Sequence, residues 1–195
     1  MSTASAARPT PTPRPSSAFL TVDLDREGKQ TGFLMIPHSP HDDAWGATRV
    51  PIAVIKNGTG PTVIMEGGNH GDEYEGPITI CDLIRDLDPG RVQGRLILMP
   101  ANNVHAVMAG QRTSPVDGLN FNRTFPGDPR GTITQQISAF VSDHILPIGD
   151  AFLDLHSGGS SLDIIPSAIV EPTDDPALHK RNVAAGQAFD APTVG

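Results

Sequence analysis

The chain has 195 residues, of which 37% are hydrophobic and 5% aromatic, and its 20 Gly and 19 Pro together make up a fifth of the sequence. This length suits one domain of roughly 100 to 200 residues, and the Gly and Pro content excludes a long-helix bundle. The formal net charge is −8, so neither nucleic acid nor an anionic membrane is expected as a partner. A single cysteine, Cys81, excludes both an internal disulfide and a thiolate metal cluster, so any metal must be held by His and carboxylate side chains.

The N-terminal residues differ in composition from the rest of the chain. Residues 1–17 are mostly Ser, Thr, Ala and Pro, and they lack the apolar stretch of a secretory signal peptide. No apolar run in the sequence approaches the ~18 residues of a membrane span. The sequence therefore predicts a disordered tail over residues 1–17, a folded region over residues 18–195, and a reducing, cytoplasmic location.

From Phe19 onward, the predicted elements alternate between strands and helices. Strands are indicated by short apolar or alternating runs between turn residues, at 19–21, 32–36, 50–55, 61–65, 95–100 and a buried one at 151–156. Helices are indicated by apolar residues at helical spacing, at 77–88, 132–146 and 176–189, with a long loop over 102–131 and the start of a further strand at 191–195. The turn residues at 25–29 predict a hairpin. This order predicts an α/β fold with a mostly parallel or mixed sheet and flanking helices.

Three residues with metal-binding side chains follow strand ends. His70 and Glu73 lie three positions apart in the Gly-rich loop after the strand at 61–65, and His156 ends the strand at 151–156. Ligands of such sheets bind beyond the carboxyl ends of the strands, and two His with one Glu are a recurring ligand set of catalytic zinc. Each residue alone is more simply structural, but together they predict a metal site. The other histidines are expected to be structural or exposed: His38, His41, His105, His144 and His179.

A second polar group lies in the long loop. Asn122 and Arg123 are adjacent, and a guanidinium binds a carboxylate through two parallel hydrogen bonds. The pair therefore predicts a clamp for a substrate carboxylate. Arg112 lies in the same loop, while Arg130 is expected to be a solvated loop arginine.

Asp154 lies two residues before His156 and so on the same face of the predicted strand. A carboxylate in that position can accept the distal N–H of a metal-bound imidazole. It can also serve only as a cap at the strand end, and the sequence leaves both roles open.

Three motifs resemble, in order and spacing, the succinylglutamate desuccinylase/aspartoacylase family of zinc hydrolases, which is itself related to zinc carboxypeptidases. The motifs are Asn69-His70-Gly71-Asp72-Glu73, Asn122-Arg123-Thr124-Phe125-Pro126-Gly127 and Asp154-Leu155-His156-Ser157-Gly158. The metal motif alone is moderately specific, whereas the three motifs in sequence are highly specific, and the resemblance covers roughly Phe19 to the end. It implies a zinc-carboxypeptidase-like fold and one zinc ion bound by His70, Glu73 and His156.

The resemblance also implies roles for the long loop. Arg112 would polarise the scissile carbonyl, and Asn122 with Arg123 would bind the α-carboxylate of the substrate. The implied activity is zinc-dependent hydrolysis of the amide bond of an N-acylated amino acid, with N2-acetyl-L-2,4-diaminobutanoate, a compound of ectoine breakdown, as the expected substrate. Two alternatives stay open: a zinc carboxypeptidase acting on peptides, and a zinc-binding chain that is catalytically impaired.

The sequence departs from the family pattern in one respect. The family's general base is a Glu that would fall near position 220, beyond Gly195, and Glu171 comes too early to take that role. The resemblance therefore leads us to expect an N-terminal part of the catalytic domain, with a sheet that is incomplete at its C-terminus. Such a chain is expected to have very low activity by itself, since loss of a general base costs about 10²- to 10⁴-fold.

Overall fold

The structure, a computed structural model, describes residues 12–39 and 44–195. The chain forms two compact units, of which the first ends at Gly159 and the second runs over Ser160–Gly195. Residues 1–11 of the expected tail lie outside the described residues, as does His41.

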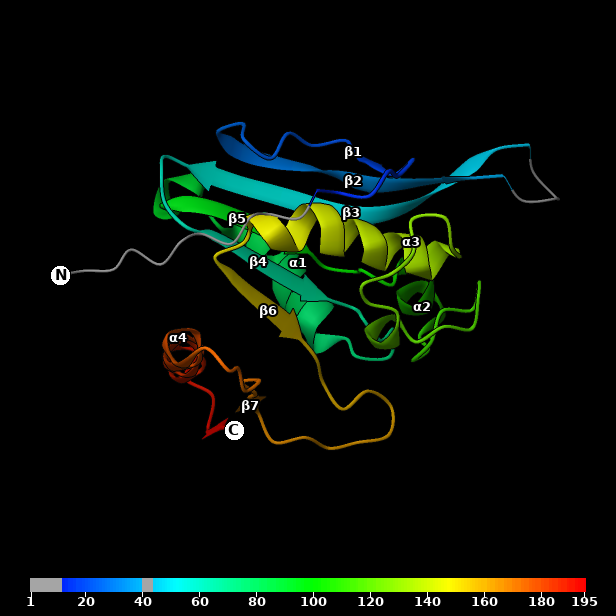
Figure 1. The fold of residues 1–195 in the computed structure, drawn as a ribbon. Coiled ribbons are helices and arrows are strands. Elements are labelled where there is room, and N and C mark those ends of the chain that lie inside the picture. The colour runs from blue at the N-terminus through cyan, green and yellow to red at the C-terminus, as the bar shows by residue number, and fades with distance from the viewer. Residues whose placement is uncertain (1–11, 40–43) are drawn as a thin grey trace. The chain divides into compact units, whose positions relative to one another are not determined.

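The first unit is built around a six-stranded sheet in the order β1-β2-β3-β5-β4-β6 (Figure 1). The strands are β1 (Phe19–Leu20), β2 (Gly28–His38), β3 (Gly46–Asn57), β4 (Thr62–Gly67), β5 (Gly94–Met99) and β6 (Ala151–Leu155). Strands β1, β2, β3 and β5 pair antiparallel, whereas β4 pairs parallel with both β5 and β6. The predicted mixed sheet is confirmed, and its parallel part brings the carboxyl ends of β4 and β6 together.

The predicted N-terminal hairpin is present, with Phe19 of β1 opposite Met35 of β2. Strand β2 then forms a longer hairpin with β3, in register from Gly28 opposite Lys56 to His38 opposite Gly46. Both strands extend past the predicted runs, because ladder hydrogen bonds continue through polar residues that an apolar pattern does not mark.

Two helices cover opposite faces of this sheet (Figure 1). Helix α1 (Glu75–Asp86) packs on one face, and α3 (Ile133–Phe140), continued by a π turn over Val141–Ile145 and a 3-10 turn over Leu146–Ile148, packs on the other. Because side chains alternate along a strand, neighbouring residues of β3 face different helices. The buried core on the α3 side comprises Leu34, Ile36, Val50, Ile52, Ile64, Ile97, Met99, Phe121, Ile137, Phe140, Val141 and Ile145. The core on the α1 side comprises Ala53, Ile55, Ile80 and Leu98.

The segment predicted as a long loop contains two short elements that the sequence pattern did not indicate. Helix α2 spans Val104–Ala109, and a 3-10 turn spans Phe121–Arg123. The side chain of Asn103 accepts a hydrogen bond from the Ala106 amide at 3.4 Å, and Gly110, with φ 61°, ends the helix in the left-handed conformation. A helix this short is held by its caps rather than by an apolar repeat, which explains why the prediction of a loop was wrong.

The strand predicted at 151–156 is confirmed as β6, but the expectation that it is buried was wrong. Strand β6 lies at the edge of the sheet and, within the described residues, pairs with β4 alone. Its side chains are exposed or half-buried, and Phe152 is 45% exposed. An apolar run indicates a strand but does not show whether other strands lie on both of its sides.

The second unit contains strands β7 (Ser167–Ala168) and β8 (Thr193–Val194), which pair parallel, and helix α4 (Pro176–Ala188). Asp175 caps α4 by accepting hydrogen bonds from the amides of Ala177 and Leu178. The predicted last helix and the strand that follows it are both confirmed. Across the described parts of both units, no helix combines the length and the apolar character needed to span a membrane.

Candidate metal centre

The carboxyl ends of β4 and β6 bring the three predicted metal-binding residues together. The two strands pair parallel up to Gly67 opposite Leu155, so the loop after β4 and the residue after β6 begin side by side. His70 and Glu73 come from that loop, and His156 directly follows β6. One ligand atom from each residue can be chosen so that all three lie within 4.8 Å of one another.

The loop that carries His70 and Glu73 is packed tightly against helix α2. The amide of Gly71 donates to the Gln111 carbonyl at 2.8 Å. A Cβ atom at Gly71 would overlap the backbone of Ala106, so no other residue fits without moving the loop or the helix. Glycine therefore fixes where His70 and Glu73 can lie.

The carboxylate of Glu73 is buried, with a side chain that is 5% exposed, and each of its oxygens has a partner. Oε1 accepts from Nη1 of Arg112 at 3.2 Å. Oε2 lies 2.8 Å from Nδ1 of His156 and accepts from the amide of Ser157 at 3.0 Å. Several fixed donors thus hold a buried negative charge at the centre of the group.

The imidazole of His156 lies between two carboxylates. Its Nδ1 faces Glu73, and its Nε2 donates to Oδ2 of Asp154 at 2.8 Å. The hydrogen bond to Asp154, which outweighs the cost of burial and is reinforced by Glu73, raises the pKa of His156 to about 9.

His70 is 2% exposed, and its orientation is set by the backbone. Its Nδ1 lies 3.1 Å from the carbonyl oxygen of Arg112. A carbonyl only accepts, so Nδ1 carries the proton and the lone pair lies on Nε2. Burial lowers the pKa of His70 and so favours the neutral form that can bind a metal.

The donor set fits a metal ion. Two imidazoles and a buried carboxylate converge from two strand ends, and for both histidines the ring nitrogen on the far side has its own hydrogen-bond partner. Metal-bound histidines are generally oriented by this kind of second partner. The group can therefore hold a divalent cation with nitrogen and oxygen ligands.

The structure brings two of the three predicted loop residues to this group. Arg112 reaches Glu73 as described, and Nδ2 of Asn122 lies 3.4 Å from Nε2 of His156. Arg123 is exposed, and its guanidinium donates to the carbonyl of Asn122 at 3.2 Å.

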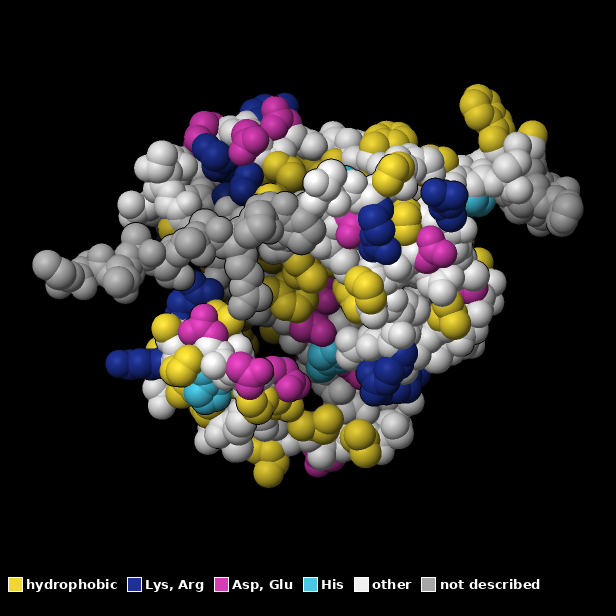
Figure 2. All heavy atoms as spheres, viewed as in Figure 1, with side chains coloured by type: hydrophobic (Ala, Val, Ile, Leu, Met, Phe, Trp, Pro, Cys, Tyr) yellow, Lys and Arg dark blue, Asp and Glu magenta, His cyan; other side chains and the backbone are white. Residues whose placement is uncertain are grey.

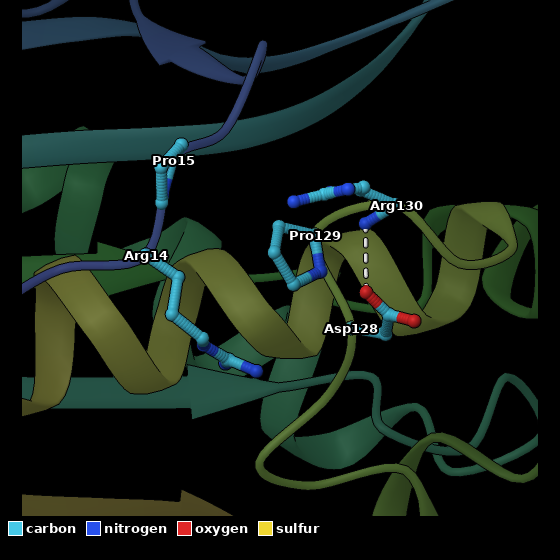
Figure 3. Close-up of a pocket in the computed structure, with 5 residues that line it drawn as sticks. All are labelled: Arg14, Pro15, Asp128, Pro129 and Arg130. Atoms are coloured by element: carbon cyan, nitrogen blue, oxygen red, sulfur yellow. Dashed lines mark hydrogen bonds between the residues drawn. The ribbon is translucent and has the colours of Figure 1, made fainter.

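Arg130 is exposed, as predicted. It lines a surface depression, about 380 Å³ in volume, together with Arg14, Pro15, Asp128 and Pro129 (Figure 3). Within this depression the backbone amide of Arg130 donates to Asp128 at 2.9 Å. None of these residues belongs to the candidate metal centre.

Sequence reasoning missed a set of buried polar residues next to the centre. Glu66, Asn69 and Asn102 are each at most 1% exposed, and Asn69 donates to both oxygens of Asp154 at 2.8 and 2.7 Å. Only Asn69 lies in a recognised motif. A glutamate at the end of an apolar strand is itself a signal, since charged residues are rarely buried without a partner.

The charged side chains on the face shown in Figure 2 are of both signs, with Lys and Arg interspersed among Asp and Glu.

The fold and the site define the class: an α/β protein with a candidate metal centre of two histidines and a glutamate at the parallel edge of a mixed sheet. The chain belongs to the succinylglutamate desuccinylase/aspartoacylase family, whose catalytic-domain model matches residues 59–195. This confirms the family that the three motifs indicate.

Three relatives give the extent of the likeness. The chain is 48% identical over 179 residues to the N-alpha-acetyl-L-2,4-diaminobutyric acid deacetylase of Halomonas elongata, covering 92% of the chain and 52% of that protein. It is 45% identical to the product-bound structure of the ectoine utilization protein EutE (DoeB) from Ruegeria pomeroyi, with a TM-score of 0.89, covering 93% of the chain and 56% of the other. A metallo-carboxypeptidase from Burkholderia cenocepacia shares the fold, with a TM-score of 0.63 at 18% identity, covering 76% of the chain and 45% of the other.

The predicted carboxypeptidase-like fold is thereby confirmed. The chain spans about half the length of these relatives.

Proposed function

We propose that the chain carries the metal centre of a zinc-dependent deacylase that hydrolyses the amide bond of an N-acylated amino acid, with N2-acetyl-L-2,4-diaminobutanoate as its substrate. The observation that carries this proposal is the convergence of His70, Glu73 and His156 at the ends of two parallel strands, with Arg112 on the same carboxylate. The likeness to the Halomonas deacetylase over 92% of the chain supports the substrate.

One zinc ion would be held by Nε2 of His70, an oxygen of Glu73 and Nδ1 of His156. When bound, zinc would supply a Lewis acid and a water whose pKa is lowered towards ~7. Asp154 keeps the proton of His156 on Nε2, and the Arg112 carbonyl keeps the proton of His70 on Nδ1. The proton on Nδ1 of His156, which lies against Glu73, would leave when the metal binds, and each imidazole would then present a lone pair to the centre.

Arg112 would stabilise the oxygen that becomes negatively charged as the amide is attacked. A guanidinium has five N–H donors, and the contact of Nη1 with Glu73 leaves others for the substrate. The Arg112 side chain is 56% exposed, so it is open to a ligand while remaining held on one side. Fixed donors at such a position are worth several kcal/mol of transition-state stabilisation.

Asn122 and Arg123 would orient the substrate through its α-carboxylate. Asn122 lies within 3.4 Å of His156, so a carboxylate bound by this pair would lie next to the metal centre. The exposed guanidinium of Arg123 supplies the planar donor pair that a carboxylate fits. Holding the substrate in one orientation lowers the entropic part of the barrier.

The test is acetate release from N2-acetyl-L-2,4-diaminobutanoate after zinc reconstitution, using the 195-residue chain and, in parallel, the full product of its gene. We expect acetate release from the gene product, with weaker or no cleavage of other N-acetylated amino acids. Cleavage of peptides without deacetylation would favour a carboxypeptidase instead. Failure of both preparations to release acetate while they bind zinc stoichiometrically would contradict the proposed activity.

A further inference from the structure

A buried carboxyl group, Glu66, ends strand β4 close to the metal centre and has no place in the proposed chemistry. It is 1% exposed and lies in register with Asp154 on the neighbouring strand β6. Among the described residues, no Lys or Arg contributes to its electrostatic environment. A carboxyl group in this setting is costly to bury, so its retention calls for a physical reason.

The hydrogen bonds of Glu66 connect it to the centre through one residue. Nδ2 of Asn69 donates to Oε1 of Glu66 at 3.3 Å and also to both oxygens of Asp154 at 2.8 and 2.7 Å. Nδ2 of Asn102 donates to the other oxygen, Oε2, of Glu66. The amide of Asn69 therefore bridges two carboxyl groups, and Glu66 holds it in place from the buried side.

Asp154 is in turn the partner of His156, whose Nε2 donates to it at 2.8 Å. A chain of hydrogen bonds thus runs from the core to the metal centre through Glu66, Asn69, Asp154 and His156. Asp154 has a side chain that is 23% exposed and could turn towards solvent. Asn69, fixed by Glu66, is the buried group that prevents this.

The protonation state of the Glu66 carboxyl agrees with a role as a neutral hydrogen-bonding group rather than as a charged one. Burial, and then the nearby negative charge of Asp154, raise the pKa of Glu66 to about 8. The Oδ1 atoms of Asn69 and Asn102 are both buried without a partner. A protonated carboxyl needs one acceptor, and the Asn102 amide can provide it by exchanging the positions of its oxygen and nitrogen, whereas the Asn69 nitrogen stays turned to Asp154.

We propose that Glu66 is a positioning residue for metal binding: through Asn69 it fixes the Asp154 carboxylate, and Asp154 holds His156 with Nδ1 turned to the metal centre. The inference rests on the proposed zinc centre and adds a buried residue that no motif marks. It predicts that zinc affinity depends on a side chain that contacts none of the three ligands.

The experiment measures the dissociation constant for Zn²⁺ by competition with a chelator in the full 195-residue chain. In Glu66→Gln the length and the hydrogen-bonding capacity of the neutral acid are kept, so the wild-type affinity is expected. Glu66→Ala removes the hydrogen bonds that hold Asn69 in place. The affinity for Zn²⁺ is expected to fall at least about 10-fold, the lower end of the range seen when a residue that supports a metal ligand is lost. Glu66→Asp keeps the carboxyl group but shortens the side chain by one methylene, so the hydrogen bond to Asn69 is weakened. This variant is expected to bind zinc more weakly than Glu66→Gln.

Ile64→Ala is the matched control, because Ile64 lies two residues earlier on β4 and is fully buried in the core. It should lower the unfolding midpoint, measured by circular dichroism, without weakening zinc binding to the folded chain. If Glu66→Ala does not fold, the order of the Gln and Asp variants decides the question.

Equal affinities for wild type and Glu66→Ala, an Asp variant as tight as the Gln variant, or an equal loss in Ile64→Ala would each overturn the positioning role alone. A wild-type chain that binds no zinc would overturn the proposed metal centre and this inference with it.

Discussion

His156 and Asp154 are joined by a 2.8 Å hydrogen bond from Nε2 of the imidazole to Oδ2 of the carboxylate. The bond shows that the Asp154 carboxylate contacts the histidine and is not merely a cap of the strand end. It also leaves Nδ1 as the nitrogen that faces Glu73. Strand alternation alone, which places residues 154 and 156 on one face, was enough to raise this possibility.

Replacement of Asp154 by Ala is expected to weaken zinc binding by about 10- to 100-fold, the usual cost of losing the partner of a metal-bound imidazole. The ring of His156 would then lose the acceptor that fixes its orientation. Chelator competition measures the effect, and Asp163→Ala, which removes an exposed acid of the second unit, is the control for the change in net charge. Wild-type affinity in Asp154→Ala would show that the bond does not orient the ligand.

The convergence of His70, Glu73 and His156 could be predicted because its signals are local. His70 and Glu73 lie within one Gly-rich loop, and His156 follows an apolar run, so strand ends and residue types sufficed. Helix α2, at Val104–Ala109, could not be predicted, because it depends on a cap at Asn103 and a left-handed Gly110 rather than on periodicity.

The buried polar set could not be predicted for a different reason. Asn102 is 36 residues from Glu66, and Asp154 is 85 residues from Asn69. Only the parallel register of β5, β4 and β6 brings these residues together, and a single sequence does not contain that register. The apolar pattern likewise gave β6 but not its position at the sheet edge, and so not the exposure of Phe152.

Gly71→Ala is expected to destabilise the fold by about 1–3 kcal/mol, the typical cost of inserting a methyl group into a packed region. The new Cβ would overlap the backbone of Ala106, so the loop with His70 and Glu73 must move away from α2. Zinc affinity should fall in the same variant. Gly90→Ala is the matched control, since its Cβ would meet nothing closer than 3.4 Å. Chemical denaturation and chelator competition provide the measurements, and two unchanged values would contradict the packing argument.

The free energy of unfolding should depend on pH through Glu66. In the folded chain its pKa is raised to about 8 from an ordinary value of 4.5, so between these values the folded state binds more protons than the unfolded state. Stability from this group is therefore complete below about pH 4.5 and is lost as the pH rises through about 8. Its slope is at most about 1.4 kcal/mol per pH unit.

Urea unfolding of the wild type and of Glu66→Gln, between pH 5 and 8 and with a chelator present, checks this dependence. The difference in stability between the two proteins should shift towards the Gln variant as the pH rises, because glutamine does not ionise. Parallel pH profiles would mean that Glu66 titrates normally in the folded chain.

Arg112→Ala is expected to reduce the deacetylase kcat of the full gene product by about 10²- to 10³-fold, the cost of removing one donor to the developing oxyanion. Zinc content should be unchanged, because Arg112 contacts the Glu73 carboxylate but would not itself bind the metal. Arg130→Ala, which removes an exposed guanidinium outside the centre, is the control. A fall in zinc content that parallels the fall in kcat would instead assign Arg112 a role in holding Glu73.

Arg14 links the segment before β1 to the turn that follows the predicted carboxylate clamp. Its guanidinium donates to both oxygens of Asp143, at 2.7 and 3.1 Å, and to the carbonyls of Pro126 and Gly127, at 2.8 and 2.9 Å. In Arg14→Ala the turn loses these contacts, so the backbone amide of Gly127 should exchange with solvent faster. The KM of the full gene product should rise severalfold with little change in kcat, because the turn lies beside Asn122 and Arg123 in the chain and not among the metal ligands.

Arg130 provides the control for this prediction, since it lines the same surface depression as Arg14 (Figure 3) and donates to Asp128 there through its backbone amide, which Arg130→Ala retains. In Arg130→Ala, hydrogen exchange at Gly127 and KM should both stay at wild-type values. An Asp143→Asn variant keeps an acceptor but removes the charge, so its effect should be smaller than that of Arg14→Ala. If exchange at Gly127 rises equally in the Arg14 and Arg130 variants, positive charge near the turn, rather than the two carbonyl contacts of Arg14, stabilises it.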